Sequence, residues 1–240
     1  MHHESCVLAR VPLPASSMRR LFPLALASLI ATSACSAAGG PRPDPERLRG
    51  VLARLHEDVR TNRDRARAAA DTVSAQQAVA AHLIDWFEEE TLASSTRMLE
   101  ELVFLGRGSS YPPYRIGYDA LVLSGDVGQI PDGELRGRLA GFYAEASRLA
   151  EAGPQTTHHL VERLDAVAPT GFWYQIFRLE PHRTVPSDFR KSLQVLDEAG
   201  LERSLRVAIR DLERYRAALL AHAAQADTLV TLLEAARPTQ

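Results

Sequence analysis

The chain has very little cysteine, and neither of its cysteines lies in the region with helical patterning. Cys6 and Cys35 are the two cysteines among 240 residues, and both precede Pro45. A disulfide framework, a metal site built from paired cysteines and a thiol nucleophile are therefore excluded from the main body of the chain.

The sequence also lacks an excess of charge and a strand pattern. The formal net charge is −2 and the isoelectric point is near 6.5, so there is no basic footprint for nucleic acid. Beyond Pro45, apolar and polar residues never alternate with the period of two that marks half-buried strands. Hydrophobic residues make up 45% of the chain, enough for an ordinary core. These features predict an all-α protein without a nucleic-acid partner.

The N-terminal region has the pattern of an export signal. From Met18 the chain reads MRRLFPLALASLIATSACSAAGG, with two arginines, an apolar stretch and small residues before Cys35. The apolar stretch is shorter than the roughly 20 residues of a membrane span. Ala34-Cys35 resembles the cleavage site of a bacterial lipoprotein signal, which predicts a lipid on Cys35 and an exported, membrane-anchored protein. The alternative is a cut after Ala38, which would release a soluble periplasmic or secreted chain.

These features divide the chain into four parts. Residues 1–17 suit no signal peptide, so we expect the native start at Met18 and assign 1–38 to a non-native extension plus the signal. Residues 39–45 form a Gly/Pro tether. Residues 46–236 are expected to form a single helical domain, and 237–240 a tail.

Two long stretches repeat apolar residues at steps of three and four, which predicts helices with a narrow apolar seam. The first runs from Pro45, capped by Asp44, to about residue 90. The second follows Gly200. We expect the two to pair antiparallel in an elongated bundle. The seam positions are Leu48, Leu52, Leu55, Val59, Asn62, Ala66, Ala69, Val73, Gln76, Ala80, Leu83 and Phe87, then Leu201, Leu205, Ala208, Leu212, Tyr215, Leu219, His222, Ala226, Leu229 and Leu233.

Between them, YDALVLSGDVGQI at 118–130 predicts a helix–corner–helix insert. Ser124-Gly125 ends a short helix, because glycine is free to take positive φ, and Asp132 caps the next helix. The flanking strand and third glycine of a dinucleotide fingerprint are missing, so a phosphate-binding loop is disfavoured. Tyr118, Leu121 and Val122 are expected on one face of the short helix, and Val127 and Ile130 are expected to plug the corner. The residues expected to shape the corner itself are Tyr118, Ser124, Gly125, Gly128 and Asp132.

Two further helices complete the expected bundle. A short one covers about 94–105, and 106–114, GRGSSYPPY, is a loop by composition. The helix capped by Asp132 has a bend at Gly153-Pro154, and its apolar face is Leu135, Leu139, Phe142, Ala146 and Leu149.

The stretch from 118 to 146 also carries a resemblance. Its pattern, Tyr-Asp-x-Leu-x-x-Ser-Gly, an apolar turn, then Leu-Arg-x-x-Leu and an aromatic pair, is similar to a segment of a family of uncharacterised bacterial membrane-anchored helical-domain proteins. VLARLHEDVRTN, residues 51–62, resembles that family's first helix after the anchor. The resemblance covers about 45–235 and implies an anchored helical domain, with no catalytic residue carried over. The matching residues are Tyr118, Asp119, Leu121, Ser124, Gly125, Ile130, Leu135, Arg136, Leu139, Phe142 and Tyr143.

Few side chains suggest chemistry. His158, His159 and Glu162 are spaced for one helical turn, but the repeated Glu-x-x-His of a helical di-iron site is missing, so we expect an exposed pair. His222 holds a seam position, which predicts hydrogen-bonded packing, with a pH-responsive contact as the alternative. The carboxylates of WFEEE, residues 86–90, have no partner base and predict a solvated helix end. We therefore expect no catalytic residue, no metal site and no cofactor.

Aromatic residues gather in GFWYQIF, residues 171–177. This stretch is either a lid on the bundle or a recognition patch of Phe172, Trp173, Tyr174 and Phe177, since aromatic side chains dominate interface hot spots. The loop SSYPPY, 109–114, is either a rigid connection or a second aromatic surface.

Three classes of function remain. The preferred one is a non-enzymatic, membrane-tethered extracytoplasmic interaction or scaffold module with an unidentified protein partner. The second is an extracytoplasmic ligand-sensing domain that acts through a partner protein, although no second membrane span or output domain is visible in this sequence. The third is an enzyme of unrecognised type, for which the sequence offers no nucleophile–base pair, metal cluster or phosphate loop.

Overall fold

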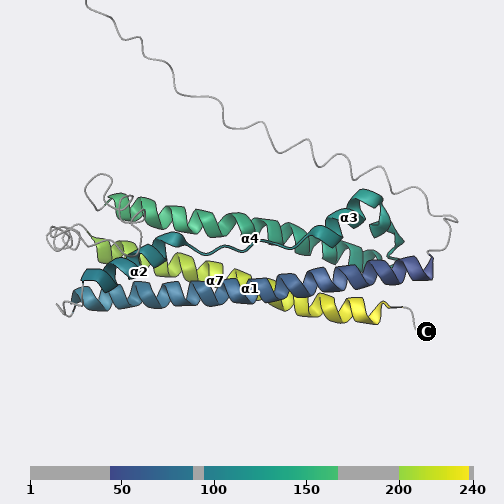
Figure 1. Cartoon of the computed structure of the whole chain (residues 1–240), viewed down its shortest axis with the longest axis horizontal. Helices are drawn as coiled ribbons and strands as arrows, with labels where there is room; N and C mark the ends of the chain where they lie inside the picture. Colours follow the sequence, from purple (N-terminus) through teal and green to yellow (C-terminus); the bar gives the residue numbers. More distant parts are fainter. Residues whose placement is uncertain (1–43, 89–94, 167–199, 238–240) are drawn as a thin grey trace, which may run out of the picture. The chain divides into compact units, whose positions relative to one another are not determined.

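The computed structural model describes residues 44–88, 95–166 and 200–237, and these residues are helical without any strand. The predicted all-α class is thereby confirmed (Figure 1). The elements are α1 (Pro45–Glu88), α2 (Ser95–Arg107), α3 (Ile116–Ser124), the 3₁₀ helix η1 (Asp126–Gln129), α4 (Gly133–Ala166) and α7 (Leu201–Ala235).

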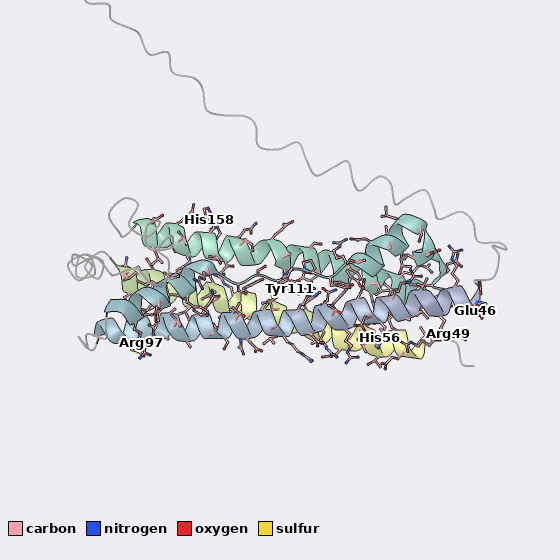
Figure 2. The ribbon with its side chains drawn as sticks, in the orientation of Figure 1. Glu46, Arg49, His56, Arg97, Tyr111 and His158 are labelled. Atoms are coloured by element: carbon pink, nitrogen blue, oxygen red, sulfur yellow. The ribbon has the colours of Figure 1, made fainter. Side chains whose placement is uncertain are left out.

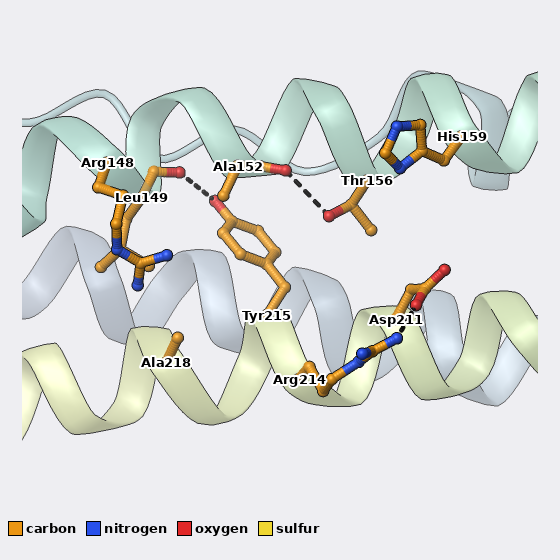
Figure 3. Close-up of a pocket in the computed structure, with 9 residues that line it drawn as sticks. All are labelled: Arg148, Leu149, Ala152, Thr156, His159, Asp211, Arg214, Tyr215 and Ala218. Carbon is orange, nitrogen blue, oxygen red and sulfur yellow. Dashed lines mark hydrogen bonds and ion pairs between the residues drawn. The ribbon is translucent and has the colours of Figure 1, made fainter. Parts of the chain in front are cut away.

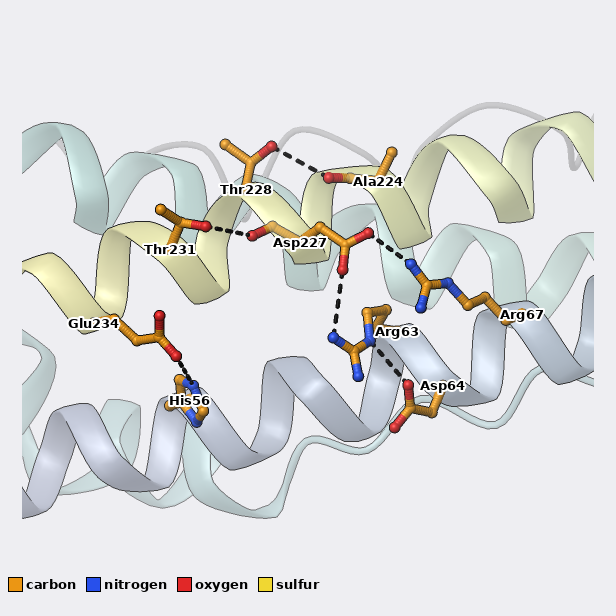
Figure 4. Close-up of polar contacts among 9 residues, drawn as sticks. All are labelled: His56, Arg63, Asp64, Arg67, Ala224, Asp227, Thr228, Thr231 and Glu234. Carbon is orange, nitrogen blue, oxygen red and sulfur yellow. Dashed lines mark hydrogen bonds and ion pairs between the residues drawn. The ribbon is translucent and has the colours of Figure 1, made fainter.

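Helices α1 and α7 pair antiparallel along their lengths, as the matching seams predict (Figure 1). Cross-helix polar contacts show the direction: His56 near the start of α1 meets Glu234 near the end of α7 at 3.0 Å, and Arg63 and Arg67 both reach Asp227, at 3.4 and 2.7 Å (Figure 4). Exposed ion pairs of this kind each contribute at most about 1 kcal/mol. The apolar seam therefore provides most of the pairing energy.

The predicted seam is buried wherever its side chains are described, from Leu48 to Leu83 on α1 and from Leu201 to Leu233 on α7. The side chain of Phe87 lies outside the described part of the chain. The 44 residues of α1 correspond to a length of about 66 Å. Such a length can be stabilised only by packing, because an isolated helix gains little from propensity alone.

The interior has two apolar clusters that differ in side-chain size. At the start of α1, large residues from α1, α3, α4 and α7 pack together, including Leu52, Leu121 and Leu139. Further along α1, alanines replace leucine, and Tyr111 and Tyr215 fill the space that these small side chains leave.

Helix α4 packs on α7, while residues 108–115 run without helical structure between α1 and α4. Helix α4 continues through the expected bend at Gly153-Pro154 to Ala166. Gly153 is buried at a point where the 108–115 segment approaches α4 closely: a Cβ added there would lie 2.6 Å from the Ser109 carbonyl oxygen. A side chain larger than hydrogen has no room at this position.

None of the helices in the described ranges combines the length and the apolar character that a membrane span requires.

Candidate functional site

The corner between α3 and α4 is held by bonds among its own residues. Gly125 ends α3 with a φ of 75°, in the left-handed region that favours glycine. The Ser124 hydroxyl donates to a carbonyl three residues earlier at 3.3 Å. Asp132 Oδ1 accepts hydrogen bonds from two amides at the start of α4, at 2.8 and 3.2 Å. Gly128 lies in η1 without positive φ. These groups therefore shape the turn itself.

One residue of the predicted corner face points the other way. Tyr118 stacks on Tyr143 with ring centroids 4.0 Å apart, and Leu121 is buried. Val122 is 51% exposed, so its assignment to the same inward face is wrong. One residue further along a helix rotates a side chain by about 100°, which carries Val122 past the edge of the buried face.

A carboxylate on α1 supports the start of α3. Asp58 is buried, and its Oδ2 accepts a hydrogen bond from the Tyr118 amide at 2.9 Å. Burial raises the pKa of Asp58, while the amides of Tyr118 and Gly117 oppose the rise. The Tyr143 hydroxyl lies close to this carboxyl group without hydrogen-bond geometry. Asp58 thus caps a helix from a distance, a role that local sequence does not reveal because its partner is 60 residues away.

Asn62 fastens the 108–115 segment to α1. Its Nδ2 donates to the carbonyls of Asp58, at 3.0 Å, and Tyr114, at 2.6 Å. Its Oδ1 accepts from the Tyr114 amide at 2.7 Å and from the Tyr111 hydroxyl at 3.1 Å. Every hydrogen-bonding group of this buried side chain is used. Asn62, a polar residue of the α1 seam, therefore fixes the path of the 108–115 segment.

Tyr111 is buried inside the bundle (Figure 2), where its side chain contacts His222 on α7. Its hydroxyl lies 2.9 Å from His222 Nε2. Since the single hydroxyl proton goes to Asn62, Nε2 carries the imidazole proton and donates it to the Tyr111 oxygen. Phe142 stacks on the imidazole at 4.2 Å. The reading of Tyr111 as part of a second aromatic surface is therefore wrong, since the ring is fully buried.

We expect acid to destabilise the protein through His222. Burial lowers its pKa to about 4, while Glu145 opposes the shift. Below the ordinary value of 6.5 the unfolded chain takes up a proton that the folded protein refuses, so stability falls as the pH drops toward 4. Between pH 7 and pH 5 this loss should reach about 2 kcal/mol.

Urea unfolding at both pH values measures that loss, with His222→Gln as the control, because glutamine keeps a polar partner for Tyr111 but does not titrate. The raised pKa of Asp58 acts in the opposite direction in both proteins. A decrease of equal size in wild type and His222→Gln would contradict the assignment to His222.

A shallow groove of about 240 Å³ lies between α4 and α7 (Figure 3). At its floor the Tyr215 hydroxyl donates to the Leu149 carbonyl at 3.2 Å. At its rim Asp211 pairs with Arg163 at 2.6 Å and with Arg214. Burial pushes the pKa of Asp211 up, but the two guanidinium groups outweigh burial and hold it below its ordinary value. The lining residues are Arg148, Leu149, Ala152, Thr156, His159, Asp211, Arg214, Tyr215 and Ala218.

Arg214 also belongs to a row of exposed arginines on α7, which we call the arginine row: Arg203, Arg206, Arg210 and Arg214. Their spacing of three, four and four residues places them on one helical face. Arg206 pairs with Glu202 at 2.5 Å. Among the residues that the structure describes, Arg203 and Arg210 make no hydrogen bond or ion pair. Sequence reasoning missed this row, although its spacing was visible.

His158 lies on the outer face of α4 (Figure 2), and His159 is exposed beside the groove between α4 and α7 (Figure 3). His158 Nε2 is 3.2 Å from Glu162, and both side chains are exposed, as expected of a surface pair. In residues 44–88, 95–166 and 200–237, no three His, Cys, Asp or Glu side chains come close enough to hold a metal ion.

Three predicted features lie outside the described residues: the cleavage and lipidation site at Ala34 and Cys35, the aromatic patch of Phe172, Trp173, Tyr174 and Phe177, and the WFEEE side chains. No family model, curated protein or solved structure matches this chain. Membership of the anchored helical-domain family stays a prediction.

Proposed function

We propose that this chain is a non-enzymatic, membrane-tethered extracytoplasmic interaction module that binds an acidic partner protein. A lipid on Cys35 would hold it to the membrane, and the arginine row of α7 would meet the partner. The observation that carries the proposal is the row itself. It places four cations on one exposed helical face, and two of them form no ion pair within residues 44–88, 95–166 and 200–237.

The position of the row suits a partner away from the membrane. Gln77 contacts the Ile209 carbonyl at 3.5 Å, so the row lies beside the part of α1 near Gln77. That part is about 48 Å along α1 from Pro45, where the tether joins. Unpaired arginines favour carboxylate partners, because the guanidinium fork binds both carboxylate oxygens.

The interior supports a binding role over a chemical one. Asp58 caps α3, Asn62 holds the 108–115 segment and His222 Nε2 holds Tyr111, so each of these side chains has a structural role, although His222 Nδ1 has no hydrogen-bond partner among the described residues. The groove between α4 and α7 has about 240 Å³, and two open hollows of about 530 and 370 Å³ lie along the arginine row itself. These hollows are lined mostly by charged side chains on the surface of α7, which suits contact with a partner protein.

Metabolic labelling tests the anchor. A bacterial host that expresses the full chain should incorporate labelled fatty acid into wild type and not into Cys35→Ser. A mature wild-type chain that starts at residue 39 without label would show instead that the protein is released in soluble form.

Site-specific photo-crosslinking tests the partner surface. A photoreactive residue at Ala217, which is exposed one turn beyond Arg214, should give a discrete adduct in cells. Arg203→Glu with Arg210→Glu should lower its yield at least about tenfold, because like charges would then face each other. Arg54→Glu with Arg60→Glu, on the exposed face of α1, changes the net charge equally and should leave the adduct unchanged. Equal loss in both double variants, or no adduct at all, would refute the arginine row as the binding surface.

A further inference from the structure

The largest exposed apolar side chains of the described residues gather on α3. Ile116 is 69% exposed, Val122 51% and Leu123 88%, and the fourth exposed large hydrophobic residue, Leu220, lies on α7. Ile116, the exposed Ala120 and Leu123 recur at i, i+4 and i+7, so they form one stripe along α3, while Val122 is rotated about 100° from Leu123. We call Ile116, Ala120 and Leu123 the α3 apolar face. Aliphatic side chains clustered in this way usually mark a contact surface.

This face lies at the end of the domain where the tether enters. Arg47, in the first turn of α1, is 2.5 Å from Asp126, immediately after α3. Leu121 of α3 and Ile130 share one buried cluster with Leu48 of α1. Figure 2 marks the same end of α1 by Glu46 and Arg49. The α3 apolar face is therefore close to Pro45, where residues 35–44 join the domain.

The length of that connection limits the distance to a membrane. Pro45 is ten positions after Cys35, and ten residues of extended chain span at most about 35 Å. With a lipid on Cys35, the start of α1 stays within this distance of the bilayer surface. The far end of α1 is about 66 Å further along the helix. The tether thus holds the α3 apolar face at high effective concentration near the lipid.

Three arginines near the face are paired with carboxylates, which reduces the positive charge that they offer to anionic headgroups. Contact with lipid would then depend on insertion of the aliphatic side chains, as for helices that lie in the membrane interface. The pairs are Arg47–Asp126 at 2.5 Å, Arg115–Asp119 at 3.0 Å and Arg138–Glu134 at 2.7 Å.

From these observations we propose that the α3 apolar face docks on the surface of the lipid bilayer and orients the tethered domain. Ile116 and Leu123 enter the interfacial region, with Ala120 between them. The arginine row, far along the domain, is then held away from the membrane. This inference rests on the proposed membrane tether and adds a second, non-covalent contact to it.

Hydrogen–deuterium exchange on vesicles tests the docking. Residues 43–240 form a compact unit of their own, so the chain that begins at Cys35 keeps the whole domain. Its Cys35, the one cysteine left, is coupled to a maleimide lipid in phosphatidylcholine vesicles. Amides of α3 should exchange at least about fivefold more slowly on vesicles than in solution, because docking suppresses local opening. Amides around Leu220 should be unchanged.

The matched variant is Ile116→Ser with Leu123→Ser. Both positions are exposed, so the variant should melt as wild type does, while vesicle protection of α3 disappears. The proposal is overturned if the α3 amides of wild type show no protection on vesicles, or if the double variant keeps that protection. It is also overturned if the protection requires anionic lipid. Protection that grows with protein density on the vesicle would overturn it as well, because it would indicate docking to a second copy. Chemical coupling makes the result independent of lipidation in cells, which the labelling experiment decides separately.

Discussion

Tyr111→Ala should lower the free energy of unfolding by about 3–5 kcal/mol, as other aromatic truncations in protein cores do. The ring is fully buried in the part of the interior where α1 has alanines, and these short side chains cannot extend into the space that it would leave. Its loss also leaves His222 Nε2 without its partner and removes one of the bonds to Asn62. Thermal unfolding followed by circular dichroism should show a decrease in Tm of about 10 °C or more.

Tyr111→Phe separates the two contributions. Phenylalanine fills the same volume but leaves the His222 N–H unpaired, which should cost about 1–3 kcal/mol. A Tyr111→Ala protein that melts within a degree of wild type would show that the 108–115 segment is not part of the core.

The same glycine-to-alanine substitution should change the free energy of unfolding in opposite directions at two positions of α4. Gly141→Ala should stabilise the protein by up to about 1 kcal/mol, because alanine is the better helix former and nothing lies within 4 Å of the new Cβ. Gly153→Ala should destabilise it by about 1–3 kcal/mol, the range for overpacked interiors. The new Cβ would lie 2.6 Å from the Ser109 carbonyl oxygen and 2.7 Å from the Tyr215 hydroxyl. Pro154 adds strain, since a residue with a Cβ before proline disfavours helical geometry.

Urea unfolding of the two variants beside wild type measures the difference. If Gly141→Ala and Gly153→Ala stabilised the protein equally, the close approach of the 108–115 segment to α4 would be wrong. The register of that segment on α1 would then be wrong as well.

The long helices and the corner were predictable because their signals are local. A step of three and four residues depends only on helix geometry, so each described seam position of α1 and α7 was identified before its partner was known. The left-handed glycine at 125 and the cap at Asp132 follow from conformational preferences of single residues. Val122 was misassigned because a nine-residue helix gives too few turns to define its buried face.

The polar interior required the tertiary structure. Asn62 could be placed on the seam, but its partners Tyr111 and Tyr114 lie 49 and 52 residues away in a loop whose composition predicts only irregular structure. Asp58 lies beside the seam, and Gly117 leaves space for its carboxylate, with a Cβ built there only 2.7 Å from Asp58 Oδ2.

The sequence by itself thus determined an all-α chain with two matched long helices, because hydrophobic periodicity reports which side of each helix is buried. Only the tertiary structure decided what fills the space beside the small residues of α1, because that choice depends on where the 108–115 segment crosses the helix. The crossing is set by long-range hydrogen bonds from Asn62, together with the fit of Tyr111 against His222 and of Ser109 against Gly153. Such bonds form between groups that only the folded chain brings together, so no periodicity in the sequence encodes them.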